Sequence, residues 1–377
     1  MSGRRIRAMF VKELRHIVRD GRSLGMALGV PVLLLLLFGF ALSLDVDRIP
    51  TLVYDQDRTA ESRELIARFQ GSRFFQIRGF VSDYGVIERE IDRGAVLLAV
   101  VIPQKYGERL TGGHRTQVQL LLDGSDSNTA SIAKGYAETV VRGQDVVVKS
   151  AAQDRRAGIR MMVPVDARVR VWYNSTLESK NYVVPGLIAV ILMIISALLT
   201  SLTIAREWES GTMEQLLSTP LRPAEMVLGK MLAFFVVGVV DSLIAVLVGV
   251  FVFEVPLRGN IFLLAATTGI FLVGALFWGI FISAVTKTQL LAYQLGILSS
   301  FLPAFLLSGF IYSVENMPGV IQVVTYIVPA KYFVTILKGI FLKGVGVEVL
   351  WVPILLLVVY AAIIFTAATN KLKAKLT

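Results

Sequence analysis

The sequence predicts an α-helical polytopic membrane protein with six transmembrane helices and an α/β extracytoplasmic domain inserted between spans 1 and 2. The first observation is composition, because 55% of the 377 residues are hydrophobic and the mean hydropathy is +0.66, above the values of soluble domains. The second is a series of apolar runs of about twenty residues, long enough to cross about 30 Å of hydrocarbon. The third is a long polar segment that separates the first run from the others.

Taken in order, the runs predict the boundaries of every segment. They are 1–23, a cytoplasmic interfacial amphipathic helix; 24–44, span 1; 45–180, a periplasmic α/β domain; 183–204, span 2; 205–225, a cytoplasmic helical connection; 227–253, span 3; 262–285, span 4; 290–312, span 5; 313–347, outer re-entrant helices; 349–368, span 6; and 369–377, a cytoplasmic tail.

Lysine and arginine near the ends of the spans predict the orientation, because positive flanks stay in the cytoplasm. The N-terminal flank carries seven of these residues, and Lys371, Lys373 and Lys375 follow the last span. We therefore expect both termini in the cytoplasm, and much of the net charge of +10 faces anionic headgroups. No nucleic-acid partner is expected.

The polar segment 45–180 changes from helical to mixed periodicity. Strands are predicted at "IPTLVYD", "FFQIRGF", "AVLLAVVIP" and "TQVQLLLDG", and short helices at "TAESRELIARF", "VSDYGVIEREI" and "PQKYGERL". A longer helix is expected at about 128–156, and "ARVRVWYN" is expected to return as a strand. Strands that alternate with helices predict an α/β sheet domain.

Residue types exclude several classes of chemistry. The chain has no cysteine, so disulfides and thiolate metal sites are impossible. Its two histidines are His16, expected inside, and His114, in a turn outside, so neither a metal cluster nor a Ser-His-Asp set is expected. No phosphate-binding loop is present. We expect no catalytic residue, no metal and no cofactor bound by this chain.

Asp241 is the ionisable residue that falls near the middle of a predicted span. An intramembrane carboxyl favours a role in meeting a cation or proton, but a buried carboxyl bonded to a serine or threonine is an equal alternative. Gln294 raises the same question in span 5. In span 4, Ala275, Gly279 and Ser283 recur every fourth residue, a spacing more typical of ordinary helix packing than of a dimer face.

The connection 205–225 is predicted to be a short, sharply bounded helix. Gly211 is suited to a left-handed cap, Thr212 and Gln215 match a capping box, and Pro223 suits the first turn of the next helix. Its apolar stripe is Met213, Leu216 and Leu217. Glutamates surround that stripe, and an acidic helix suits a protein groove better than an anionic leaflet.

Two motifs carry a family resemblance. "AREWESGTMEQLLSTPLRPAEMVLGK" (205–230) and "LPAFLLSGFIYSVENMPGVIQVVTYIVPAKYF" (302–333) are similar to the signatures of ATP-binding-cassette type-2 exporter permeases. The order of segments also resembles that family, and "DGSDSNTA" (123–130) resembles its bacterial multidrug or efflux branch, which has a large external domain.

The resemblance implies that the connection 205–225 is a coupling helix, which docks on a separate ATPase subunit. The implied docking residues are Arg206, Glu207, Glu209, Gly211, Thr212, Met213, Glu214 and Leu217. The candidate translocation path contains Asp241, Gln294, Ser308, Tyr326 and Lys331.

The implied function is export of a hydrophobic or amphiphilic cargo, drug-like or lipid-like, from the cytoplasm or inner leaflet. The chain would be no enzyme by itself, because ATP and Mg bind the partner ATPase. The implied partners are two copies of that ATPase, a second permease copy or paralogue, the lipid bilayer and a possible periplasmic adaptor. The implied location is the bacterial inner membrane.

Two other interpretations stay open from the residues alone. One is a non-transport envelope scaffold or assembly protein, whose external domain binds partners. The other is a secondary transporter that couples protons through Asp241, although no inverted repeat is evident and intramembrane charges are few.

Overall fold

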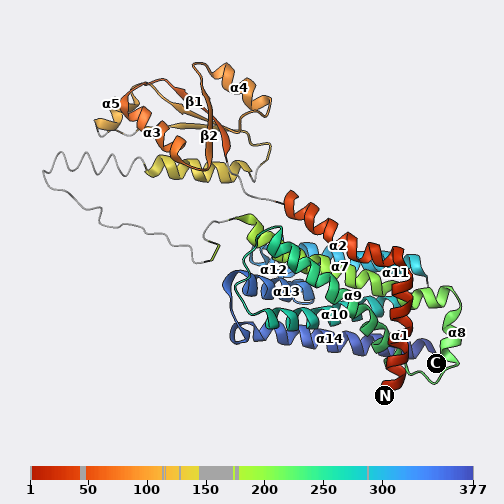
Figure 1. Ribbon diagram of the computed structural model, residues 1–377. Coiled ribbons are helices and arrows are strands. Elements are labelled where there is room, and N and C mark those ends of the chain that lie inside the picture. Colours follow the sequence, from red (N-terminus) through yellow and green to blue (C-terminus); the bar gives the residue numbers. More distant parts are fainter. Residues whose placement is uncertain are drawn as a thin grey trace. The chain divides into compact units, whose positions relative to one another are not determined.

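The computed structural model describes residues 2–42, 48–112, 114, 116–126, 129–143, 173–174, 178–286 and 288–376. The chain forms two compact units, and each is described by itself. The α/β unit comprises 44–170, and the helical unit comprises 1–43 with 171–377 (Figure 1). The predicted strand "ARVRVWYN" and the end of the helix predicted over 128–156 lie outside the described residues, except for Tyr173 and Asn174.

The α/β unit contains a four-stranded sheet in the order β2-β1-β3-β4. The strands are β1 (Ile49–Asp55), β2 (Phe75–Phe80), β3 (Leu98–Ile102) and β4 (Gln119–Leu122). β1 pairs in parallel with β2 and β3, whereas β3 and β4 are antiparallel. All four predicted strands in this part of the sequence are present.

Helices cover both faces of this sheet (Figure 1). α3 (Ala60–Gly71), α5 (Tyr106–Thr111) and the helix at 129–143 share one core with β1 and β3, built around Leu65, Phe69 and Val100. α4 (Tyr84–Asp92) packs Ile87 onto the other face, against Leu52 and neighbouring residues of β3. Because neighbouring residues of a strand face opposite sides, β1 and β3 are apolar almost throughout.

The helical unit consists of helices of very different lengths, most of them apolar. They are α1 (Gly3–Arg19), α2 (Gly21–Ala41), α7 (Ser179–Glu209), α8 (Thr212–Leu217), α9 (Pro223–Phe251), α10 (Ile261–Val285), α11 (Gln289–Leu307), α12 (Gly319–Thr325), α13 (Pro329–Lys338) and α14 (Val347–Leu376).

Five described helices, α7, α9, α10, α11 and α14, are long and apolar enough to cross a membrane. A sixth span results if α12 and the stretch Pro329–Lys343, which bend by 83° relative to one another, are counted as one. In α2, the apolar stretch Ala27–Ala41 is shorter than these five. The protein is therefore a polytopic membrane protein, and the prediction of six spans beginning with 24–44 stays a prediction.

Close helix packing centres on α7, the most buried of these helices. A Cβ atom on Gly279 of α10 would lie 2.0 Å from Thr200 Oγ1 and 2.3 Å from the Ala197 carbonyl oxygen. One turn on, Ser283 Oγ accepts hydrogen bonds from the backbone N–H groups of Ile204 and Ala205, both at 2.9 Å. The small-residue stripe of α10 thus packs on α7 within the same chain.

The ends of α11 and α14 differ from the sequence prediction. Span 5 was expected to reach residue 312, but α11 ends at Leu307, and Gly309 turns the chain with a φ of +77°. The predicted tail 369–377 is instead helical as far as Leu376, because α14 continues without a break. Between these helices, α12 and α13 are separate and Pro329 begins α13.

Candidate functional site: the connection from α7 to α9

The connection from α7 to α9 is a bounded helical turn. α7 ends at Glu209, and Gly211 follows with a φ of +73°, a left-handed conformation that favours glycine. Pro223 occupies the first turn of α9, as predicted.

The predicted capping box of α8 is wrong. Gly211, which has no side chain, is the residue that precedes α8, so Thr212 is already inside the helix. The Thr212 hydroxyl instead donates to the Glu207 carbonyl oxygen at 3.4 Å and lies 3.1 Å from Ser210 Oγ. Thr212 therefore fastens α8 back onto the last turn of α7.

The Glu225 side chain caps the start of α9. Glu225 Oε2 accepts a hydrogen bond from the Arg222 backbone N–H at 3.0 Å, and Glu225 Oε1 accepts one from Ser2 N at 2.7 Å. Arg5 Nε lies 3.1 Å from Glu225 Oε2, and an Arg5 N–H donates to the Pro220 carbonyl oxygen. The first residues of the chain are thus bound to both ends of the turn that leads from α8 to α9.

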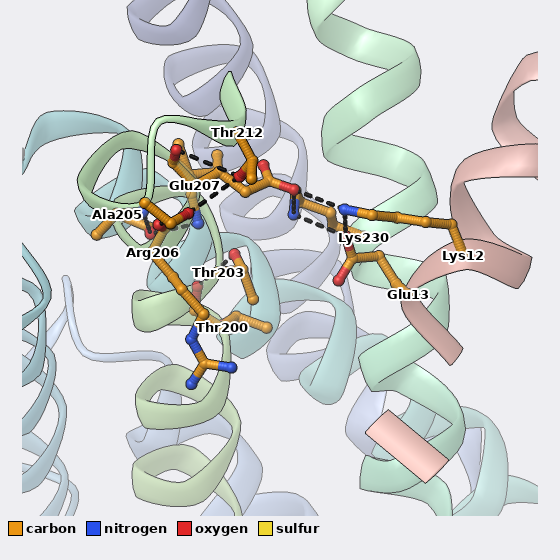
Figure 2. A network of polar contacts seen from close by, with 12 residues as sticks. Lys12, Glu13, Thr200, Thr203, Ala205, Arg206, Glu207, Thr212 and Lys230 are labelled. Atoms are coloured by element: carbon orange, nitrogen blue, oxygen red, sulfur yellow. Dashed lines mark hydrogen bonds and ion pairs between the residues drawn. The ribbon is translucent and has the colours of Figure 1, made fainter. Parts of the chain in front are cut away.

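Next to this connection, four charged side chains from three helices meet (Figure 2). Lys12 Nζ lies 2.9 Å from Glu13 Oε1 and 2.8 Å from Glu207 Oε1. Lys230 Nζ lies 2.9 Å from Glu13 Oε1 and 3.0 Å from Glu207 Oε1. We call these four residues the charge cluster. It joins α1, the last turn of α7 and the first turns of α9.

The charge cluster is balanced, with two cations and two carboxylates, and every member except Lys12 is buried. Lys230 is 1% exposed, and Glu13 and Glu207 are each 6% exposed. Burial raises the pKa of Glu13, but Lys230 and Lys12 outweigh it and hold the pKa below its usual value. Burial likewise lowers the pKa of Lys12, but Glu207 and Glu13 outweigh it and raise the pKa. Glu13 and Lys12 are therefore stabilised in their charged forms.

Glu207 has one further feature. Its Oε2 atom is buried and has no hydrogen-bond partner among the described residues. A buried, unpaired carboxylate oxygen is costly unless the whole group is firmly held. Removal of the buried cation, Lys230, therefore leaves an uncompensated buried charge in the charge cluster.

The structure separates the predicted docking residues into two groups. Met213 is fully buried in a core with Ile204 and Met226, and Glu207 belongs to the charge cluster. Both side chains are used inside the chain, and a docking role for Met213 and Glu207 stays a prediction. Arg206 Nε donates to Gln289 Oε1 at 3.4 Å, which ties the end of α7 to α11.

The other predicted docking residues lie on the surface. Glu209, Gly211, Thr212 and Glu214 are exposed. Glu209 Oε2 also accepts a hydrogen bond from the Gln289 backbone N–H at 2.8 Å. Leu217 is the last residue of α8, and its side chain lies outside the described part of the chain. Among the side chains of α8 that the structure describes, the exposed ones are thus polar, and that of Glu214 is acidic.

The candidate path residues are not brought together as one set. Lys331 Nζ lies 3.6 Å from the centre of the Tyr326 ring. Asp241 and Ser308 are buried, each with a side-chain oxygen that has no hydrogen-bond partner among the described residues. Gln294 is exposed on α11. Among the described residues, no hydrogen bond or ion pair joins Asp241 or Gln294 to the other three.

Sequence reasoning missed Glu13, Lys230 and Glu225, and it assigned Lys12 only to the positive flank. Two signals were available. Glu13 is the single acidic residue within α1, and Lys230 interrupts the apolar run of α9 one turn after its start. An isolated acid in a basic helix and a cation inside an apolar run both indicate buried partners. Within the described ranges, no group of histidine, cysteine or acidic residues is arranged to hold a metal ion.

Comparison with known proteins decides the family. The family model described as "ABC-2 family transporter protein" matches residues 22–369. The chain belongs to the ABC-2 transporter family.

Relatives of this permease match over its full length. The chain is 35% identical over 371 residues to the "Probable multidrug ABC transporter permease YbhS" of Escherichia coli K12, covering 98% of this chain and 96% of the relative. It is 32% identical over 372 residues to "Probable multidrug ABC transporter permease YbhR" of the same strain, covering 98% and 99%. A shorter match, 27% identical over 195 residues, joins 52% of this chain to 27% of "ABC transporter G family member 20" of Dictyostelium discoideum.

Proposed function

We propose that this permease is the membrane subunit of an ATP-driven exporter and that a separate ATPase subunit docks on α8. The cargo proposed is hydrophobic or amphiphilic, drug-like or lipid-like, and moves out of the cytoplasm or inner leaflet. The support comes from family membership and from one observation, the exposed acidic face of α8 held on a buried charge cluster.

The proposed assembly has two permeases, identical or paralogous, and two ATPase subunits that bind ATP and Mg. It lies in the bacterial inner membrane, with six spans and both termini in the cytoplasm. The α/β unit is then periplasmic, where it is available to an adaptor. The positive flanks of the first and last helices support this orientation.

The contacts at the connection suggest how movement of α8 reaches the spans. Thr212 holds α8 to α7, Glu207 holds the end of α7 to α1 and α9, and Glu225 holds the start of α9 to the N-terminus. A displacement of α8 therefore acts on α7, α9 and α1 together. Because α7 packs closely on α10, the same displacement extends into the centre of the bundle.

The structure sharpens the choice of mutations for a docking test. Glu207→Lys would introduce a third cation into the buried charge cluster, so its failure would report misfolding rather than lost docking. Glu214→Lys changes an exposed residue and leaves the charge cluster intact. We therefore use Glu214→Lys as the test, and Glu88→Lys, an exposed charge reversal on α4, as its matched control.

The experiment is a mild-detergent pull-down of the tagged permease from its native membrane, with mass spectrometry and an ATPase assay of the eluate. We expect a phosphate-loop ATPase to co-elute, to be lost with Glu214→Lys and to be retained with Glu88→Lys. Elution of the permease with envelope proteins and without an ATPase would overturn the proposal in favour of a scaffold. ATPase binding that survives Glu214→Lys would overturn the docking role of α8.

A further inference from the structure

The sheet of the α/β unit contains a topological switch point between β1 and β3. The chain passes from β1 through α3 to β2 on one side, and then through α4 to β3 on the other side of β1. α3 and α4 lie on opposite faces of the sheet. In open α/β sheets, such a switch leaves a crevice outside the carboxyl ends of the parallel strands, and ligands bind there.

A cavity of about 670 Å³ lies at this edge. Gln56 follows the carboxyl end of β1, Val101 and Pro103 mark that of β3, and Tyr84 begins α4 after β2. The segment that leads into β4 closes the remaining side, because β4 runs antiparallel to β3 and places Gln119 opposite Val101. The cavity therefore coincides with the crevice that the strand order predicts. Its volume lies in the range of small-molecule sites.

Arg109 of α5 is the charged side chain among the described residues that line this cavity. No described acidic side chain lies within ion-pair distance of it. The nearby acids of the loop after β1 are already occupied. Asp55 accepts hydrogen bonds from Ser62 Oγ and from two backbone N–H groups, and Asp57 accepts one from the Gly107 N–H at 2.8 Å. The guanidinium is thus the cavity's recognition group for an anion.

The other lining groups suit a small organic molecule. The Tyr84 hydroxyl donates to Gln119 Oε1 at 3.0 Å, and the Tyr84 ring packs edge-on against Tyr54 with centroids 5.4 Å apart, so this wall is fixed in place. Thr116 Oγ1 is buried and has no hydrogen-bond partner among the described residues. Buried hydroxyls are normally paired, so this atom is suited to a ligand or a water molecule. Val118, which is partly exposed, supplies apolar surface.

We propose that the crevice at the carboxyl edge of β1 and β3 binds a small organic anion. Its single acidic group, a carboxylate or phosphate, pairs with Arg109, its polar atoms meet Thr116 and the amides of Gln56 and Gln119, and its apolar part lies on Val118. This site stands on the α/β unit alone and does not depend on the docking of an ATPase at α8.

The absence of cysteine from the chain provides a sensitive test, since one introduced thiol has no background. The variant Gln117→Cys places a thiol at the exposed rim of the cavity. The measurement is the rate at which N-ethylmaleimide alkylates this thiol in the full chain, held in nanodiscs. The probes are hexanoate and hexanamide, which match in shape and differ in charge. We expect hexanoate to slow alkylation several-fold and hexanamide to have little effect.

Three matched variants decide the outcome. Arg109→Gln is expected to abolish protection by hexanoate, whereas Arg93→Gln, which removes an exposed arginine paired with Glu90, is expected to retain it. In Gln70→Cys, at the end of α3, hexanoate should not change the rate. The proposal is overturned if hexanoate gives no protection, if hexanamide protects equally, or if protection survives Arg109→Gln. Loss of the ATPase from the pull-down would leave this result unchanged.

Discussion

The two ends of α7 hold their neighbouring lysines in different ways. In its last turns, Glu207 takes part in a cluster of four ion pairs with Lys12, Glu13 and Lys230, of which the two made by Lys230 are buried. In its first turn, the Tyr182 ring lies 3.4 Å from Lys338 Nζ, which also donates to the Gly309 carbonyl oxygen at 3.1 Å. Within the described ranges, Lys338 forms no ion pair. The two sites are about 38 Å apart along the helix axis, at 1.5 Å per residue.

This difference means that the Glu207 end of α7 is held firmly, whereas the Tyr182 end is held by contacts that can break and reform. Removal of one partner from a buried ion cluster costs about 3–5 kcal/mol, because it strands a charge. A cation on an aromatic ring contributes about 0.5–2 kcal/mol. If the proposed transport cycle moves α13 against α7, the weaker contact is the one that can break and reform. The charge cluster keeps α1, α7 and α9 together.

The largest expected effect is that of Lys230→Met. It leaves Lys12 alone against Glu13 and Glu207, so we expect the free energy of unfolding to fall by about 3–5 kcal/mol. The measurement is reversible unfolding in mixed micelles, followed by tryptophan fluorescence.

Two further variants sharpen this result. Lys12→Met removes a cation whose side chain is 49% exposed, and it should cost about 1 kcal/mol or less. The double variant Lys230→Met with Glu13→Gln restores charge balance and should regain part of the loss. A Lys230→Met protein as stable as wild type would mean that the charge cluster does not fix this end.

The next effect tests whether close packing carries movement from α7 to α10. Gly279→Ala places a methyl group against the Ala197 carbonyl and Thr200, and the helix backbones must separate, at a cost of about 1–3 kcal/mol. Gly269→Ala is the matched control on the same helix, since its nearest neighbour, Phe235, would lie at an ordinary 3.6 Å. The same unfolding assay should show a loss for Gly279→Ala and no loss for Gly269→Ala. Equal stabilities would show that α10 has room to move.

A smaller effect is expected at the other end of α7. Lys338→Met removes the contacts to Tyr182 and the Gly309 carbonyl and should cost about 0.5–2 kcal/mol. Lys338→Arg keeps a cation over the ring and should cost less. A loss as large as that of Lys230→Met would erase the contrast between the two ends.

The sequence allowed the strands, the apolar helices, Gly211 and Pro223 to be predicted, because each depends on local periodicity or on backbone conformation. It did not allow the charge cluster to be predicted. Its members stand at 12, 13, 207 and 230, and only tertiary packing shows that Glu13 and Lys230 face one another. The same limit explains Met213, whose apolar character fits a docking surface and a core equally well.

Replacement of Asp241 has the smallest expected effect on stability. Unlike the lysine sites at the two ends of α7, Asp241 lies inside the bundle. It lies near the middle of α9, 2% exposed, and its Oδ1 has no hydrogen-bond partner among the described residues. Asp241→Asn keeps the volume and removes a group that would bury a charge, so we expect stability to stay within about 0.5 kcal/mol of wild type or to rise.

Transport by this stable variant then distinguishes the two roles of Asp241. A carboxyl that only packs is replaced by asparagine without loss of cargo export from inverted vesicles containing the assembled transporter. A carboxyl that meets a cation or proton cannot be replaced by asparagine in this way, so export fails while the protein stays folded. A clear fall in stability would contradict both, because it would mean that the carboxyl makes a strong interaction within the fold. In that case Asp241 would belong with the charge cluster, as a second fixed point inside the bundle.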